Sequence, residues 1–245
     1  MPCGNDQRMR LSTRALAAFS CLALGAYVIV VRPRLLRWGA SDEELARPYP
    51  GADIVPKGNR AATMAVTIDA PPDRVWPWLV QMGYDRAGWY SWDRLDNGGR
   101  PSADRIHPEW QEINLGDRLT AWSPGGPVGA WEVAALEPGH FLGLRGLSDL
   151  RGRPLDPARL RPRVYLEGLW GFLLEQLPGE RTRLVVSGYQ TTRPRWLQTV
   201  WDFFVYPPVH WSMQTRQFAN IKRLAERDQA QASAGLSRGS AEVSQ

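Results

Sequence analysis

The longest apolar run lies close to the start of the chain. Residues 15–31 (ALAAFSCLALGAYVIVV) carry no charge and are bounded by Arg14 on one side and by Arg32 and Arg34 on the other. About 20 apolar residues cross a bilayer as a helix, and a snorkelling Arg14 would add residues 11–13 to the run. The pattern predicts an N-terminal transmembrane anchor, residues 1–37, whose span covers about residues 12–31.

Three other interpretations of this run stay open. A cleaved signal peptide has a shorter apolar region followed by a small-residue cleavage site, whereas this run ends in bulky residues before Arg32. A lipoprotein signal at Cys21 disagrees with the apolar residues that continue beyond the cysteine. A buried core helix would have to bury an apolar surface on all sides between flanking arginines.

The pattern changes beyond the apolar run to that of a folded domain. Residues 38–61 resemble a linker with one short helical turn, for which Ser41 and Glu44 are placed to form a capping box. Residues 62–69 (ATMAVTID) alternate and are β-branched, which predicts a strand. The domain is therefore expected to begin at about residue 62.

An amphipathic helix is predicted at residues 73–82, because two prolines open it and Gly83 ends it. The buried face of this helix is expected to be Val75, Trp76, Leu79 and Met82. Residues 84–116 then form a long irregular stretch rich in Trp, Asp and Arg. Loops of this length in compact domains are usually functional or contain short helices.

The second half of the chain predicts antiparallel strands followed by a helix. Strands are expected at residues 118–122, 130–136, 141–145, 165–176 and 183–191, with a hairpin turn at Pro178-Gly179-Glu180. A helical region is expected at residues 195–226, broken by Pro207-Pro208, with Phe218, Ile221, Leu224 and Ala225 as its core stripe. The domain then covers residues 62–227, and residues 228–245 are expected to be a disordered polar tail.

This order of elements predicts an α+β fold in which a curved antiparallel sheet wraps around the C-terminal helix. An antiparallel sheet with one apolar face needs a cover for that face, and only the last helix is long enough. If the sheet curls around the helix, a cavity opens between them, lined by the inward-facing strand positions.

The charge distribution supports the division into anchor and domain. The chain has 245 residues, a net charge of +5 and a pI of about 9.5, which would normally raise the question of nucleic acid. Residues 1–37 hold six arginines against one aspartate, so they carry the whole excess, and the rest of the chain is neutral. A nucleic-acid partner is therefore disfavoured. Three arginines on each side of the run leave the membrane orientation undecided, with a slight preference for a cytoplasmic domain.

The chain resembles the SRPBCC superfamily, the START and birch-pollen-allergen-like helix-grip proteins, and in particular its bacterial polyketide cyclase-like members. The residues that carry the resemblance are Arg37–Ala40, Ile68–Pro72, Val75–Gln81, Trp89–Asp93, Asn97, Ala103–Ile106, Pro108–Gln111, Gly116-Asp117 and Ile221–Glu226. The likeness covers about residues 38–227. It implies a helix-grip fold preceded by the N-terminal transmembrane helix, while a shared fold does not select one function.

Three functions follow as expectations from this resemblance. Members of the superfamily bind lipids, sterols or polyketides, so the first expectation is a hydrophobic small molecule, lipid-like or polycyclic, in the internal cavity. The second is a cyclase or dehydratase that uses a loop carboxylate as general acid or base. The third is a non-catalytic interaction module whose cleft is filled by side chains.

Five carboxylates crowd the loop at residues 84–116, namely Asp93, Asp96, Asp104, Glu109 and Glu112. Asp93 and Asp104 are the candidate catalytic residues, because a desolvated carboxyl group with a raised pKa can transfer protons. The alternative is that both cap short helices and pair with Arg94 or Arg105.

Other catalytic chemistries find little support in the sequence. The three histidines, His107, His140 and His210, are too scattered for a metal site, and both cysteines lie in the first 37 residues. No nucleophile elbow, P-loop or dinucleotide-binding motif follows a strand. No metal and no cofactor are expected.

Aromatic residues are the main candidates for a cavity lining, since the chain holds 12 Trp. The proposed ligand-cavity residues are Trp89, Tyr90, Trp92, Trp110, Trp122, Trp131, Trp170 and Phe172. The alternative is ordinary core packing beneath the long loop. Residues 196–211 hold six further aromatic residues, which would either dock at a membrane interface beside the anchor or pack over the sheet.

Overall fold

Antiparallel strands form one curved sheet in the computed structural model, which describes residues 16, 18–123, 126–149 and 152–243. Within that part of the chain the strands are β1 (Asn59–Arg60), β2 (Met64–Ile68), β3 (Arg118–Ser123), β4 (Gly126–Glu137), β5 (Phe141–Ser148), β6 (Tyr165–Leu177) and β7 (Arg181–Arg193). Their order is β1-β7-β6-β5-β4-β3, and β2 also pairs with β7. The predicted α+β sheet is confirmed.

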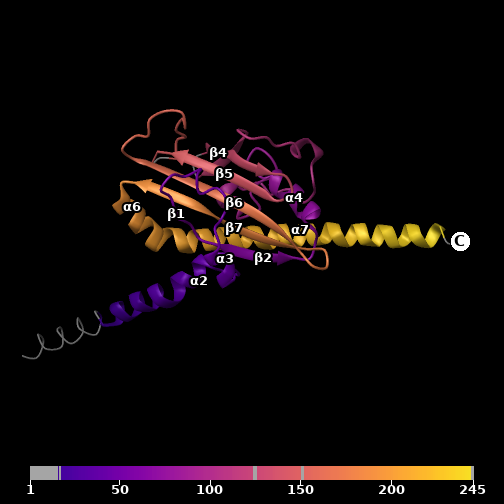
Figure 1. Cartoon of the computed structure of the whole chain (residues 1–245), viewed down its shortest axis with the longest axis horizontal. Helices are drawn as coiled ribbons and strands as arrows, with labels where there is room; N and C mark the ends of the chain where they lie inside the picture. Colours follow the sequence, from indigo (N-terminus) through magenta and orange to yellow (C-terminus); the bar gives the residue numbers. More distant parts are fainter. Residues whose placement is uncertain (1–15, 17, 124–125, 150–151, 244–245) are drawn as a thin grey trace, which may run out of the picture.

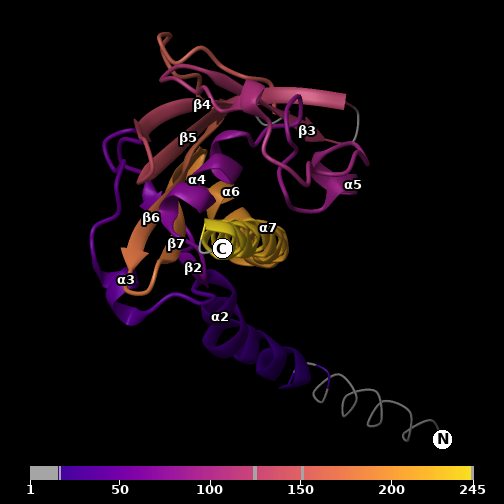
Figure 2. The same cartoon turned by 90° about the vertical axis from the view of Figure 1, so that its right-hand side faces the viewer.

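Helices pack around this sheet (Figure 1). They are η1 (Tyr27–Val31), α2 (Arg32–Leu36), α3 (Asp42–Ala46), α4 (Pro72–Val80), α5 (Asp93–Asp96), η2 (Pro108–Trp110), α6 (Arg195–Val200), η3 (Trp201–Val205) and α7 (Tyr206–Val243). Seen along its axis, α7 lies in the hollow of the curved sheet (Figure 2). The long C-terminal helix is thus the cover that the apolar face of the sheet requires.

The main core lies between the concave face and α7. Alternate residues of β6 point toward the helix, so Phe172 and Leu174 are buried against it, and the core stripe expected on α7 is buried as well. In α4, Trp78 is fully buried where Trp76 was expected, and Trp76 is half-buried. Positions 75, 78, 79 and 82 fit one helical face better than the predicted set.

The convex face of the sheet is covered by residues 38–61, which were expected to be a linker. Tyr49 is buried there against Phe141 and its hydroxyl group donates to the carbonyl of Val185 (3.0 Å). The capping box predicted at Ser41 and Glu44 is present. This segment is therefore part of the folded domain rather than a free connection.

Ion pairs also join residues 38–61 to the sheet. Arg183 on β7 donates to both carboxylate oxygens of Glu44, at 2.7 and 2.9 Å. This ion pair and the hydrogen bonds around it hold the pKa of Glu44 below its usual value, although burial alone would raise it. Arg47 pairs in the same way with Glu175 on β6 (2.7 Å).

The C-terminal helical region is continuous, whereas the sequence predicted a break at Pro207-Pro208. The π-helical turn η3 joins α6 to α7, and the prolines directly follow it. Proline has no N–H group to donate to the preceding turn, and there the carbonyls of Asp202 and Phe203 accept instead from Arg32 and Tyr27. The helix then runs on to Val243, so the predicted disordered tail is helical as far as that residue. Beyond the sheet α7 projects away from the domain (Figure 1).

The N-terminal helix leaves the domain on the other side. Residues Ala18–Leu36 are long and apolar enough to cross a membrane, by length and composition alone, and none of this stretch is buried in the described structure. A signal sequence meets the same criterion. A core helix is mostly buried, which this helix is not. Residues 12–15 and 17 of the predicted span lie outside the described residues.

Candidate functional site

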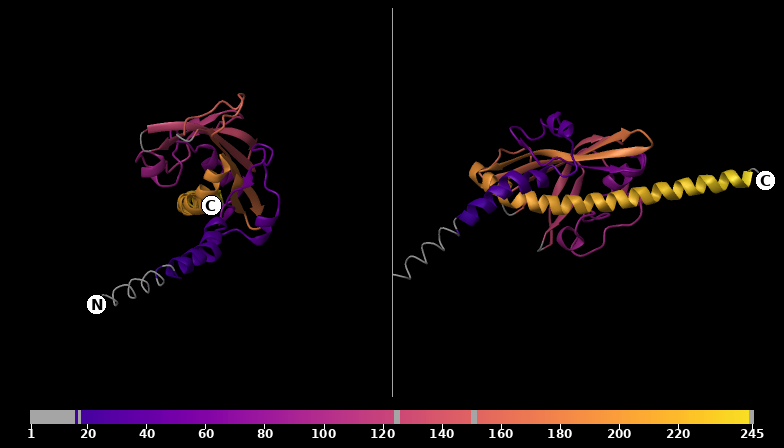
Figure 3. Two further views of the ribbon diagram at one scale, coloured as in Figure 1. Left: turned by 90° about the vertical axis from the view of Figure 1, so that its left-hand side faces the viewer. Right: turned by 90° about the horizontal axis from the view of Figure 1, so that it is seen from below.

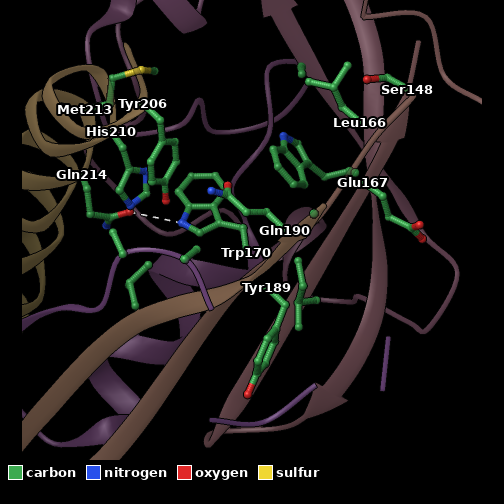
Figure 4. Close-up of a pocket in the computed structure, with 18 of the residues that line it drawn as sticks. Ser148, Leu166, Glu167, Trp170, Tyr189, Gln190, Tyr206, His210, Met213 and Gln214 are labelled. Atoms are coloured by element: carbon green, nitrogen blue, oxygen red, sulfur yellow. Dashed lines mark hydrogen bonds between the residues drawn. The ribbon is translucent and has the colours of Figure 1, made fainter. Parts of the chain in front are cut away.

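A cavity of about 530 Å³ lies between the concave face of the sheet and the first turns of α7 (Figure 4). This volume falls within the range of about 300–1,000 Å³ that small-molecule pockets occupy. Its lining is largely apolar and includes Trp89, Trp122, Trp131, Trp170, Leu147, Leu166, Val186 and Met213. The cavity is therefore of a size and character to enclose an apolar molecule.

Trp170 on β6 is the centre of the sheet wall. Its ring lies 5.7 Å from that of Trp89 and 5.6 Å from that of Trp131, between ring centroids. Its indole Nε1 donates to Oε1 of Gln214 on α7 (3.2 Å), which joins the two walls (Figure 4). The hydrogen bond fixes the indole ring and leaves its apolar surface to the cavity.

Gly146 on β5 makes room for one of these rings. A Cβ atom at this position would lie 3.0 Å from Cζ3 of Trp131, which is closer than side chains normally approach. The missing side chain therefore lets the indole lie flat against the strand and keeps the cavity open.

The helical wall comes from one face of η3 and α7. Tyr206, His210, Met213 and Gln214 follow one another at helical spacing and all line the cavity. The rings of Tyr206 and His210 stack with their centroids 4.8 Å apart. Burial lowers the pKa of His210 to about 4 and raises that of Tyr206, so both side chains are neutral at physiological pH.

Asp96, at the end of the short helix α5, places a buried carboxyl group in the cavity lining. The residue lines the cavity, is 7% exposed, and its Oδ1 has no hydrogen-bond partner. Burial raises the pKa of Asp96 to about 6; the Ser91 hydroxyl group opposes this shift, and the nearby Asp93 carboxylate adds to it. A buried carboxyl oxygen without a partner is costly, and a hydroxyl or amino group of a ligand would satisfy it.

The two carboxylates predicted to be catalytic lie outside the cavity lining. Asp93 is half-buried and its Oδ1 accepts hydrogen bonds from the backbone and side chain of Ser102 and from Asn97 (2.7–3.1 Å). Asp104 is exposed, and its backbone carbonyl accepts from Arg227. In this arrangement Asp93 organises the loop through Ser102 and Asn97. The helix α5 has no side-chain cap, so the capping role considered for Asp93 is not seen either.

The predicted aromatic lining divides into two groups. Trp89, Trp122, Trp131 and Trp170 line the cavity. The other four lie elsewhere: Phe172 is in the core, Tyr90 is buried beside Gln81, Trp110 stacks on His107, and Trp92 is 43% exposed and donates to Ser212. Strand alternation explains Trp170, but the sequence of a long loop does not reveal which of its rings turn inward.

Two polar residues at the edge of the cavity point away from it. The carboxylate of Glu167 is directed to the outer side of the sheet, where it pairs with Arg145 and with Arg161 (3.1 Å) (Figure 4). The hydroxyl group of Tyr189 also points outward and donates to the carbonyl of Tyr49 (2.8 Å). Other polar residues of the lining bond to one another or to the backbone, as Gln190 does to Asp202 and Gln217 to the carbonyl of Trp89.

Sequence reasoning missed the helical wall and the role of Asp96. Helical spacing of Tyr206, His210 and Gln214 was visible in the sequence, but the two intervening prolines suggested a break there. Asp96 was one of five acids in a loop, and nothing in the sequence distinguished it from the others. Among the described residues, no group of three or more His, Cys, Asp or Glu could hold a metal ion.

The structure is that of a helix-grip protein with an internal apolar pocket. No family model matches the chain, and no curated protein matches it either. Solved structures with a similar arrangement include a hypothetical protein from Helicobacter pylori, 16% identical with a TM-score of 0.46, covering 74% of this chain and 96% of that one. A protein from Mesorhizobium loti is 20% identical with a TM-score of 0.38 and covers 67% and 97%.

A plant enzyme is similar to the chain at the same level. Norcoclaurine synthase from Thalictrum flavum, solved as a point mutant with a transition state analogue, is 11% identical with a TM-score of 0.41, covering 71% of this chain and 98% of that one. At such identities and scores these likenesses carry no argument about the contents of the pocket. The assignment of the fold rests on the strand order and on the position of α7.

Proposed function

We propose that the chain is a membrane-anchored SRPBCC protein that binds a hydrophobic small molecule, lipid-like or polycyclic, between its sheet and α7. The observation that carries the proposal is the cavity of about 530 Å³ with five tryptophans in its lining. Asp96 and Gln214 supply the few polar contacts that would orient such a molecule. The exposed apolar helix Ala18–Leu36 supports the anchor.

The cavity argues against an interaction module with a filled cleft, since side chains leave it open.

A second candidate function is acid–base catalysis, such as cyclisation or dehydration, in the same pocket. Asp96 favours it, because a carboxyl group with a pKa of about 6 can exchange protons near neutral pH. Under this candidate, Asp96→Asn abolishes turnover of the bound molecule and leaves its retention unchanged.

The binding proposal is tested by mass spectrometry of the small molecules that co-purify with the intact chain in detergent. Leu166 lines the cavity, so Leu166→Trp fills it, whereas Leu160 is fully exposed and Leu160→Trp is the matched control. We expect an apolar molecule to be retained by the wild type and by Leu160→Trp, and to be depleted about tenfold or more in Leu166→Trp, the loss expected for about 1.4 kcal/mol.

Lipid that adheres to the anchor is the same in all these samples, so only the difference between the two variants reports on the cavity. Met213→Trp fills the cavity from the helical wall and serves as a second blocking variant if Leu166→Trp does not fold. Equal amounts of every co-purifying molecule in the blocked and control variants would reject the proposal.

A further inference from the structure

An exposed aromatic surface lies beside the N-terminal helix. It is formed by α6, η3 and the start of α7, where Trp196 is 69% exposed, Phe204 53% and Trp201 44%. Val200, Val205 and Val209 extend it. We refer to these six residues as the aromatic face. Exposed apolar patches of this kind mark interaction sites rather than ordinary protein surface.

The aromatic face is tied to the N-terminal helix by direct contacts. The Tyr27 hydroxyl group donates to the carbonyl of Phe203 (2.7 Å), and its ring stacks on that of Phe204 with centroids 6.2 Å apart. Arg32 lies over the ring of Phe203 and donates to the carbonyl of Asp202 (3.4 Å). In Figure 3 the helix and the beginning of the C-terminal helical region lie side by side at one end of the molecule.

These contacts set the depth of the face relative to a bilayer. Tyr27 lies within the apolar run, five residues before Arg32, the first charged residue after the run. At 1.5 Å per helical residue, the contacts of η3 with the helix therefore extend from Arg32 to about 7.5 Å on its apolar side, at Tyr27. Amphipathic segments bury their apolar side about 5–10 Å into the boundary between headgroups and acyl chains.

The chemistry of the face fits the same depth. Tryptophan is enriched at membrane interfaces, and between residues 196 and 211 the sequence holds one charged residue, Asp202. The side chain of Asp202 is turned to the sheet, where its Oδ1 accepts from Gln190 (3.0 Å). Arg195 at the edge of the face and Arg34 on the helix are exposed and suit anionic headgroups.

One residue of the aromatic face also belongs to the cavity lining. Trp201 lines the cavity and is also 44% exposed, and its neighbours Asp202 and Tyr206 line the cavity too. We infer that the aromatic face lies in the headgroup region of the bilayer that the N-terminal helix enters, and that the pocket exchanges its apolar ligand with that bilayer beside Trp201. The inference rests on the proposed anchor and pocket and adds the route between them.

Depth-dependent fluorescence quenching tests the docking. The full chain, with Cys3→Ser and Cys21→Ser, is placed in phosphatidylcholine–phosphatidylglycerol nanodiscs and labelled with a nitrobenzoxadiazole dye at Trp196→Cys or Phe204→Cys. Leu115→Cys is the control, because Leu115 is also an exposed apolar residue (64%) but lies next to β4, away from β7 and α6. Val209→Cys is a further position on the face if either substitution prevents folding.

We expect dye on the aromatic face to be quenched at least about twofold more by lipids with a spin label near the headgroup than by lipids with the label near the chain end, as an interfacial depth requires. Dye at Leu115→Cys is expected to be quenched by aqueous iodide alone. Iodide quenching at Trp196→Cys and Phe204→Cys equal to that at Leu115→Cys overturns the inference, as does protection from iodide without lipid quenching, which indicates a second copy of the chain.

Retention of an apolar molecule is measured on the same nanodiscs, so the two proposals fail separately. If quenching places the aromatic face in the lipid but the protein retains no apolar molecule, the pocket function alone is rejected. If the protein retains an apolar molecule but quenching places the face in water, the docking alone is rejected.

Discussion

Asp96 and His210 line the same cavity, yet burial moves their pKa values in opposite directions. Burial raises the pKa of Asp96 to about 6 and lowers that of His210 to about 4, because in both cases the charged form is disfavoured. The folded state binds more protons at Asp96 than the unfolded state between about pH 4 and 6, so this group lowers stability as the pH rises. At His210 the folded state binds fewer protons than the unfolded state, so this group lowers stability as the pH falls below about 6.5.

Asp96→Asn is expected to raise the free energy of unfolding above pH 6 and to change it little at pH 4. Asparagine keeps the shape of the side chain and removes the cost of burying a charge. Because the carboxyl group is not wholly desolvated, the expected gain at pH 8 is about 1–2 kcal/mol. The measurement is chemical denaturation of the full chain in detergent between pH 4 and 8.

His210→Gln is the control for this series, since it removes a titration of the opposite sign. His210→Gln is expected to raise the free energy of unfolding at pH 5 and not at pH 8. If Asp96→Asn follows the wild-type pH dependence throughout, the carboxyl group is solvated in the folded state and the environment described for it is wrong.

Single residues were also the hardest level to predict from the sequence. Aromatic content indicated a lined cavity, and four of the eight proposed residues line it. The orientation of a ring in the loop between residues 84 and 116 depends on hydrogen bonds such as those from Ser102 and Asn97 to Asp93, which no periodic pattern encodes.

Strand β5 shows how an element controls the cavity through a missing side chain. Gly146→Ala places a methyl group 3.0 Å from the ring of Trp131, so the ring must move. We expect a loss of about 1–3 kcal/mol in the free energy of unfolding, the usual cost of overpacking, together with weaker retention of the apolar molecule. Both are measured on the full chain in detergent.

Gly168→Ala on the adjacent strand β6 is the matched control. Its methyl group would lie 3.6 Å from the nearest atom, an ordinary contact, so the substitution is expected to be neutral or stabilising by up to about 1 kcal/mol. Equal destabilisation by the two substitutions would show that the effect comes from the strand backbone rather than from Trp131.

Elements with a regular pattern were predicted well. Five alternating segments after residue 117 became β3 to β7, and the capping box at Ser41 marked the start of α3. The two failures in the C-terminal region share one cause. Prolines and small polar residues disfavour helix in isolation, but here a π-helical turn precedes the prolines, and the helix that covers the sheet continues past them.

The whole molecule places its two apolar helical segments at one end and the last turns of α7 at the other. From residue 230 onward nearly all described side chains of α7 are exposed. Truncation after Ser233 is therefore expected to leave the Tm of the domain within about 1 °C, as for other changes away from packed regions. Differential scanning fluorimetry of the full and truncated chains in the same detergent checks this.

A control for the truncation is Ile221→Ala, which removes a fully buried side chain of the same helix. It is expected to cost about 2–5 kcal/mol in the free energy of unfolding. A large loss of Tm on truncation would mean that the end of α7 packs against something, such as another copy of the chain.

The fold as a whole followed from the order of elements and from the need to cover one apolar sheet face. The placement of residues 38–61 did not, because a segment rich in prolines and charges has the composition of a linker. Its contacts come from particular pairs, such as Arg183 with Glu44, that lie far apart in the sequence.

Because residues 38–61 pack onto the sheet, no flexible linker separates the N-terminal helix from the domain. A flexible linker would let the domain rotate freely, and the linker length would set the effective concentration of the domain near the end of the helix. Here Tyr27, Arg32 and the packed segment hold the N-terminal helix against the domain. Under the proposed anchoring, the tilt of this helix in the bilayer therefore sets the tilt of the domain. A lipid composition that changes bilayer thickness would then turn the rim of the pocket toward the acyl chains or away from them.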